Sequence, residues 1–330
     1  MTAVFATGAC WIRAQRALLR TFLAAVLGCA SAAALAAPPE SGPAPALEAA
    51  PGALSFLVVG DWGRYASVPQ VAVAHQMARA ADAIDAKFII STGDNFYPNG
   101  VASVDDPQWQ QSFEQVYTDF VLHNDWFVVL GNHDYRGNPQ AEIDYTQRSR
   151  RWHMPARYYS IVKHIDKDTD AQFFFIDTTP FILEYRKAAD QYALDGQDAR
   201  VQLAWLRDAL ANSKARWKFV VGHHHVYSGG KRDTQMELEQ TVVPLLKEYG
   251  VQAYINGHEH DLQVIRRPGG KTTYLVSGTG SEHRPTGKTE GTLFAASEYG
   301  FLVLSLMSRQ LLVQAVNENG VVLYRTSITP

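Results

Sequence analysis

The sequence predicts an α/β fold in which two mixed β-sheets pack face to face with helices outside, a four-layer αββα sandwich. From Leu54 onward, apolar runs of strand length alternate with stretches of helical spacing, which is typical of a sheet with helices packed on it. Beyond residue 262 strands predominate, so a second sheet is expected. The 330 residues are 46% hydrophobic, which is ample for one large core.

In the first half, each expected strand is a short apolar run. Leu54–Val59 is continuously apolar and ends in Gly60-Asp61, as a buried strand does. Val68–Lys87 repeats apolar residues at helical spacing and is expected to be a helix. The same reasoning predicts strands over Phe88–Ser91 and Trp126–Leu130 and a helix over Pro107–Phe120.

The second half carries two expected helices, Ala199–Ala211 and Met236–Tyr249, among many strands. Glu318-Asn319-Gly320 is a hairpin turn signal near the end. No linker interrupts the chain after Leu54, so residues 53–330 are expected to form one domain. The expected strands are Phe173–Ile176, Trp217–Val221, Val251–Ile255, Leu262–Arg266, Thr273–Val276, Phe301–Leu306, Leu311–Val316 and Val321–Thr326.

The N-terminus has the three parts of a secretory signal peptide, predicted over residues 1–36. Arg13, Arg16 and Arg20 precede an apolar run over 21–35, and a small-x-small cleavage pattern ends at Ala36. A membrane anchor and a lipoprotein are the alternatives, although the apolar run is short for a span of about 20 residues. We therefore expect an exported protein, periplasmic or secreted, without a transmembrane segment in its mature chain.

The segment that follows, residues 37–52, is rich in Pro, Ala and Gly and is predicted to be a disordered linker. Both cysteines, Cys10 and Cys29, lie in the leader. A mature chain would then rely on core packing or a metal for stability. The formal net charge of −3 argues against a nucleic-acid partner, and we expect a monomer.

Five expected strands end in a glycine followed by a polar residue of a metal-binding type. In an α/β sheet the crevice beyond the carboxyl ends of the strands is where ligands bind, and glycine allows a sharp turn there. One such pair alone is usually a turn, but five in succession favour a common site holding two metal ions about 3.5–4 Å apart. The pairs are Gly60-Asp61, Gly93-Asp94, Gly131-Asn132, Gly222-His223 and Gly257-His258.

These segments resemble the five motif blocks of the calcineurin-like metallophosphoesterases. The matching stretches begin at Gly60, Gly93, Gly131, Val221 and Gly257. The second stretch, Asp94-Asn95-Phe96-Tyr97, narrows the resemblance to the purple acid phosphatases, most of all the small tartrate-resistant type. The resemblance covers most of the chain from Leu54 to about Gly280 and implies the fold of that superfamily.

The resemblance also implies a ligand set. Asp61, Tyr97 and His260 would hold Fe(III), Asn132, His223 and His258 would hold a divalent Fe, Zn or Mn, and Asp94 would bridge the two ions. The residue chemistry agrees, because anionic oxygen donors favour a trivalent ion whereas neutral amide and imidazole donors suit a divalent one.

The implied activity is that of an acid phosphatase, which hydrolyses small phosphate monoesters by in-line attack of a metal-bound hydroxide. His133 would contact the phosphate or protonate the leaving oxygen, or would instead orient a ligand. Arg232 stands where family members have a further histidine, so it and His225 are expected as substrate contacts. On an extended strand the run His223-His224-His225 should alternate, so only His223 is expected to bind metal.

Two other interpretations stay open. A protein phosphatase or phosphodiesterase of the same superfamily would carry Asp-x-His in its first block, but Gly63 stands at that position. Hydrolysis of nucleotides stays compatible with the motifs. A non-catalytic metal-binding or scaffold protein usually lacks ligands, whereas all seven positions are filled here.

Overall fold

The computed structural model describes residues 46–194 and 196–330. The predicted signal peptide and the first part of the predicted linker lie outside these residues. Residues 46–53 contain no helix or strand. In this segment the Glu48 backbone amide donates to the side-chain oxygen Oε1 of Gln314 at 2.9 Å, and the Glu48 carboxylate pairs with Arg325 at 3.1 Å. The boundaries at residues 36 and 52 stay predictions.

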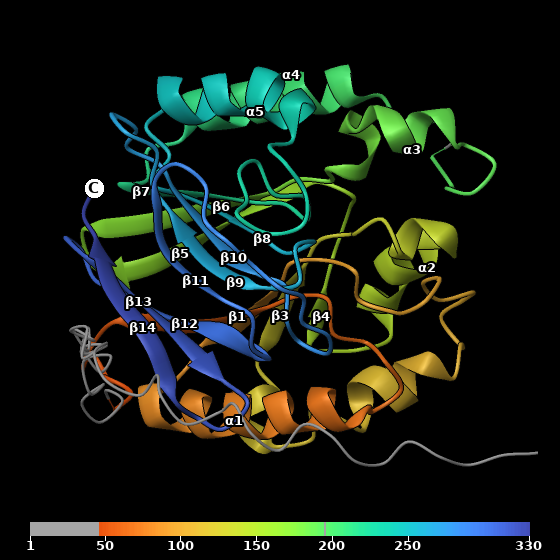
Figure 1. The fold of residues 1–330 in the computed structure, drawn as a ribbon, viewed down its shortest axis with the longest axis horizontal. Helices are drawn as coiled ribbons and strands as arrows, with labels where there is room; N and C mark the ends of the chain where they lie inside the picture. The colour runs from red at the N-terminus through yellow and green to blue at the C-terminus, as the bar shows by residue number, and fades with distance from the viewer. Residues whose placement is uncertain (1–45, 195) are drawn as a thin grey trace, which may run out of the picture. The chain divides into compact units, whose positions relative to one another are not determined.

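The first sheet has seven strands in the order β14-β13-β12-β1-β2-β3-β4 (Figure 1). Strands β1 to β4 are parallel, and β12 joins β1 antiparallel to begin a meander. The carboxyl ends of the parallel strands therefore meet at one edge. The bounds are β1 Leu54–Val59, β2 Phe88–Ser91, β3 Asp125–Val128, β4 Trp152–His153, β12 Gly300–Leu306, β13 Leu311–Asn317 and β14 Val322–Ile328.

The second sheet also has seven strands, in the order β11-β9-β10-β8-β7-β6-β5. Strands β6, β7, β8 and β10 are parallel, and the other three are antiparallel to their neighbours. Both sheets are thus mixed, as predicted. The bounds are β5 Tyr159–Asp166, β6 Thr169–Phe175, β7 Trp217–Val221, β8 Ala253–Asn256, β9 Leu262–Ile265, β10 Thr273–Ser277 and β11 Thr292–Ala296.

The sheets pack face to face through aromatic side chains. Phe173 on β6 meets Phe56 and Phe88 of the first sheet edge-on, with ring centroids 5.5 and 5.6 Å apart. The Tyr159 hydroxyl crosses between the sheets and donates to the Val128 carbonyl at 2.9 Å. These contacts bury the inner faces and hold the two sheets together.

Helices cover the outer faces, so the predicted four layers are confirmed. Helix α1 (Val68–Ile84) lies on the first sheet, whereas α4 (Ala199–Asn212) and α5 (Met236–Glu248) lie on the second (Figure 1). Short helices α2 (Pro139–Asp144) and α3 (Leu183–Lys187) connect elements near the strand ends. No helix within the described ranges is both long and apolar enough to span a membrane.

The helix predicted over Pro107–Phe120 is wrong in extent and type. The segment forms a π-helical turn over Trp109–Glu114 and a separate 3₁₀ turn over Phe120–Leu122. The Asp119 side chain accepts from Val121 N and starts the second turn, which interrupts the helix. Trp109 stacks on Tyr145 with centroids 3.5 Å apart, so tertiary packing sets this geometry.

Candidate metal centre

Five strand ends from both sheets bring the predicted ligands to one edge. Asp61, Asp94 and Asn132 follow β1, β2 and β3 of the first sheet, and His223 and His258 follow β7 and β8 of the second. All seven predicted ligands are buried, with Asn132 the most exposed at 4%. Buried polar groups of this kind need partners, so their mutual distances are informative.

One group of donors gathers around the Tyr97 hydroxyl. Tyr97 Oη lies 2.9 Å from Asp61 Oδ1 and 3.2 Å from His260 Nε2. Asp61 Oδ1 and His260 Nε2 are themselves 3.1 Å apart. A carboxylate, a phenol and an imidazole thus converge on one point.

A second group gathers around His223 Nε2. This atom lies 3.3 Å from Asn132 Oδ1 and 3.1 Å from His258 Nδ1. The other ring nitrogen of His223, Nδ1, donates to the Thr92 carbonyl at 2.9 Å. That bond fixes the tautomer and leaves the Nε2 lone pair facing the group, as in histidines that bind metals.

Asp94 stands between the two groups. Its Oδ2 accepts from Tyr97 Oη at 3.1 Å, and its Oδ1 lies 3.4 Å from His223 Nε2. Each carboxylate oxygen therefore faces a different group. The donor types and their convergence fit two cations that share Asp94.

Backbone strain accompanies the ligands. Asp61, Asp94 and His258 adopt left-handed φ angles of 59°, 48° and 68°. Such conformations cost about 1–3 kcal/mol each in non-glycine residues and cluster at functional sites. In three of the five glycine-ligand pairs the left-handed residue is thus the ligand. Among the five glycines, only Gly93 also has a positive φ angle.

Close approach explains the glycines better than turning does. A Cβ on Gly131 would lie 2.2 Å from Asp94 Oδ1, and one on Gly257 would lie 2.4 Å from Asp61 Oδ2. The expected reason for these glycines, a sharp turn, is therefore incomplete, because Gly131 and Gly257 leave room for the carboxylates of neighbouring loops.

Without a cation, the electrostatics of the centre favour a protonated His223 and an ionised Asp94. Burial alone would lower the pKa of His223, but the neighbouring Asp94 and Asp61 charges raise it to about 9. Burial would raise the pKa of Asp94, but His223 and His133 hold it far below its ordinary range. A cation and a proton would thus compete for His223 Nε2.

Outer contacts hold the ligand loops. Asp134 accepts from the backbone amides of Gly131, Asn95 and Phe96 at 2.8–3.1 Å and so ties the second and third motif loops together. Burial and the nearby Asp94 raise the pKa of Asp134 to about 7. No role was predicted for Asp134, although it directly follows Asn132-His133 in the third motif block.

His133 differs from the seven ligands because its side chain is 21% exposed. Its backbone amide donates to Asp94 Oδ1 at 2.7 Å, and its Nδ1 donates to the Pro98 carbonyl at 2.6 Å. Burial lowers the pKa of His133, and Asp94 opposes this effect. The Nε2 side of the ring lies 4.0 Å from Asp94 Oδ2 at the mouth of the centre.

The three consecutive histidines do not alternate as expected. Strand β7 ends at Val221, so they lie in an irregular loop and all three rings gather around His258, with centroids 4.9, 4.3 and 5.7 Å away. His224 Nδ1 meets the Thr178 hydroxyl at 2.8 Å, and its buried Nε2 has no hydrogen-bond partner among the described residues. The predicted alternation is therefore wrong, and the choice of His223 alone as the metal ligand stays a prediction.

The two expected substrate contacts differ in accessibility. The Arg232 side chain is 40% exposed, and its Nη1 pairs with Glu259 at 3.0 Å beside the His258 carbonyl. His225 is fully buried and its Nε2 donates to the Asp233 carbonyl at 2.9 Å. A substrate would reach His225 only after that bond opened.

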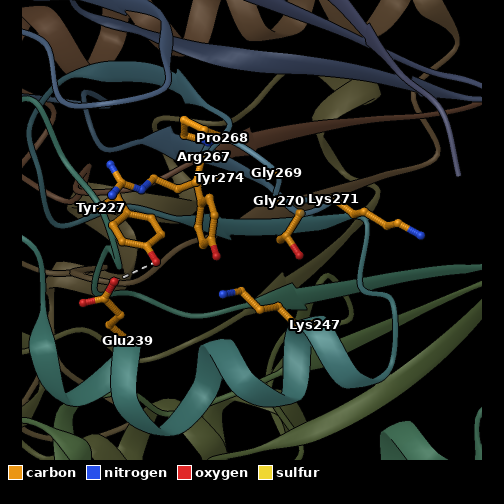
Figure 2. Close-up of a pocket in the computed structure, with 10 residues that line it drawn as sticks. Tyr227, Glu239, Lys247, Arg267, Pro268, Gly269, Gly270, Lys271 and Tyr274 are labelled. Atoms are coloured by element: carbon orange, nitrogen blue, oxygen red, sulfur yellow. Dashed lines mark hydrogen bonds between the residues drawn. The ribbon is translucent and has the colours of Figure 1, made fainter.

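A separate hollow of about 310 Å³ lies between α5 and the turn joining β9 to β10 (Figure 2). The Tyr227 hydroxyl donates to Glu239 at 2.9 Å, and Arg267 pairs with Glu290 at 2.6 Å, so these charges have partners. None of the predicted site residues lines it. It offers no converging donors for a metal ion.

Comparison with known proteins identifies the family. The family model for calcineurin-like phosphoesterases matches residues 54–262, so the chain belongs to that family. Purple acid phosphatase 17 of Arabidopsis thaliana is 42% identical over 70% of this chain and 69% of that protein. Tartrate-resistant acid phosphatase type 5 of Oryctolagus cuniculus is 32% identical over 86% of this chain and 93% of that protein. Within the family, the chain is therefore a purple acid phosphatase.

Among solved structures, GAP50, the anchor in the inner membrane complex of Plasmodium, superposes with a TM-score of 0.73 at 28% identity. The match covers 84% of this chain and 88% of that chain. The predicted family and fold are thus confirmed, as is the prediction that the chain is an enzyme of this hydrolase family.

Proposed function

We propose that the chain hydrolyses phosphate monoesters in acid at a dinuclear metal centre. Asp61, Tyr97 and His260 would hold Fe(III), and Asn132, His223 and His258 would hold a divalent Fe, Zn or Mn, because anionic oxygen donors favour the trivalent ion. The position of Asp94 carries the proposal, because its two oxygens face the two donor groups at 3.1 and 3.4 Å. When bound, the ions would supply Lewis acidity that activates water and neutralises the phosphoryl oxygens.

The chain's own residues would bind and orient the ester at the mouth of the centre. His133 is partly exposed, and its Nδ1 is occupied by Pro98, so its Nε2 is left to touch the phosphate or to carry a proton to the leaving oxygen. Arg232, held by Glu259, would meet the phosphate oxygens with its remaining N–H groups.

The centre is tested by metal analysis and turnover of the purified full chain. We expect two metal ions per chain and acid hydrolysis of p-nitrophenyl phosphate, both lost in Asp94→Ala, with Glu290→Ala as a surface control. Full turnover in Asp94→Ala would disprove the bridging role.

The role of His133 is tested by varying the leaving group. His133→Ala should lower kcat by about 10²–10⁴ for phenyl phosphate and less for p-nitrophenyl phosphate, whose leaving group needs no proton. An equal loss with both esters would argue that His133 orients the phosphate or a ligand instead.

Export is part of the proposal. Residues 1–36 would act as a signal peptide, and the protein would work in the periplasm or outside the cell as a monomer on small phosphorylated substrates. Fractionation of expressing cells should find the active chain outside the cytoplasm with Ala37 as its first residue.

The same assays separate two alternatives. GAP50 is named an anchor, and two bound ions without turnover of any ester would point to a non-catalytic role of that kind instead. A phosphodiesterase or nucleotidase would instead hydrolyse bis-p-nitrophenyl phosphate or nucleotides faster than simple monoesters.

A further inference from the structure

Arg64 lies flat against one of the proposed metal ligands. It follows Asp61 by three residues, and its guanidinium carbon is 3.7 Å from the centre of the Tyr97 ring. Its Nε donates to the Ser281 hydroxyl at 3.1 Å, and its Nη2 pairs with Glu282. The side chain is only 29% exposed. Nothing in the proposed reaction uses this residue.

The loop that carries Arg64 is held in a strained conformation. Tyr65 and Ala66 both have left-handed φ angles, 52° and 55°. The buried Gln70 side chain accepts from Arg64 N at 3.1 Å, and the Ser112 hydroxyl accepts from Tyr65 N at 2.9 Å. Two successive strained residues are kept in place by these bonds, so the surrounding structure fixes the position of the guanidinium.

Glu282 links this cation to a second proposed ligand of the same group. Its Oε2 lies 3.6 Å from His260 Nδ1, a buried atom without a hydrogen-bond partner in the described part of the chain. Glu282 Oε1 lies 3.4 Å from Arg284 Nε. One ion pair thus contacts the outer sides of both Tyr97 and His260.

We infer that the Arg64–Glu282 pair tunes how strongly Tyr97 and His260 donate electrons to the ion they share. A cation against an aromatic face stabilises the electrons of the ring. A carboxylate behind an imidazole makes that imidazole a stronger donor. Arg64 is therefore a positioning residue that sets the electronic state of the centre. The inference rests on the proposed function, because it requires a metal ion beside the Tyr97 phenolate.

A visible absorption band from a Tyr97 phenolate bound to Fe(III) would report this effect directly. Electrons move from the phenolate to Fe(III) in the transition that would give the colour. The Arg64 cation lies against the donor ring, whereas the iron would lie beyond the hydroxyl. The cation therefore lowers the energy of the donor electrons more than that of the iron orbitals that accept them. Loss of the cation should therefore move the band to longer wavelength.

The test compares spectra of purified, metal-loaded full-length variants. Arg64→Met keeps the length of the side chain but removes its charge, and should shift the band to longer wavelength by roughly 10 nm. Arg64→Lys keeps the charge without the planar group and should shift it less, in the same direction. Arg267→Met is the matched control, because Arg267 stacks on Tyr227 at 4.8 Å away from the centre and its loss should leave the band unmoved.

The possible results separate the inference from the proposed function. A wild-type protein that holds iron but lacks the band would overturn both, since Tyr97 would not be a ligand. A normal wild-type band that neither Arg64 variant moves, with both ions retained, overturns the inference alone. A raised KM with an unmoved band would also overturn it and make Arg64 a substrate contact. If Arg64→Met loses its ions, the spectrum of Arg64→Lys decides.

Discussion

Replacing Gly131 by alanine tests whether the position of Asp94 controls the centre. An added Cβ would lie 2.2 Å from Asp94 Oδ1 and 2.3 Å from Asp94 N, and neither neighbour is the end of a long flexible side chain. To reach ordinary contact Asp94 must move by about 1 Å, and a displacement of this size at a reacting centre costs about 100-fold in rate. The overpacking itself should destabilise the fold by about 1–3 kcal/mol.

The assay measures kcat/KM for p-nitrophenyl phosphate in acid, bound metal and thermal unfolding in the same samples. Gly250→Ala is the control, because Gly250 has a φ of +63° and nothing within 4 Å of an added Cβ, so its replacement strains the backbone without touching the site. We expect Gly131→Ala to lose about 100-fold in kcat/KM while Gly250→Ala keeps wild-type activity. Wild-type activity and metal content in Gly131→Ala would refute the reasoning.

Three further predictions concern colour, pH and the binding of phosphate. Tyr97→Phe should yield a colourless protein whose unfolding temperature stays close to that of the wild type, as read by absorption and calorimetry; a persistent band would exclude Tyr97 as the chromophore. Burial raises the pKa of Asp177 to about 6 from an ordinary 3.8, so the ionised form is disfavoured in the fold and stability from this group is lost as pH rises from about 4 to 6. Asp177→Asn should therefore gain up to about 3 kcal/mol relative to the wild type at pH 7 and much less at pH 4, and an equal difference at both pH values in urea unfolding would contradict this. Arg232→Gln should raise KM with little change in kcat, whereas an unchanged KM would show that Arg232 only pairs with Glu259.

The strands at the site could be predicted because each is a short apolar run closed by glycine. The bounds expected for Leu54–Val59, Phe88–Ser91 and Trp217–Val221 agree with β1, β2 and β7. Both edge strands of the second sheet were missed, since β5 carries charged residues and β11 has no fully buried residue. The π-helical turn at Trp109 depends on stacking with Tyr145, which no local pattern reveals.

The motif residues of the site could be named from the sequence, but not the contacts that support them. Arg64 meets Tyr97 from a loop whose next two residues adopt left-handed conformations, which no local pattern predicts. Glu282 reaches His260 from a loop that has no motif of its own. The histidine run was misjudged because it lies beyond the end of β7 at Val221, in a loop where side chains need not alternate. Such contacts follow from loop conformation rather than from periodicity.

The most direct test of the account is anomalous X-ray diffraction from crystals of the metal-loaded protein. We expect two peaks about 3.5–4 Å apart, one beside Tyr97 and His260 and the other beside His223 and His258, with Asp94 between them. A single peak, or two peaks that do not share Asp94, would contradict the dinuclear centre.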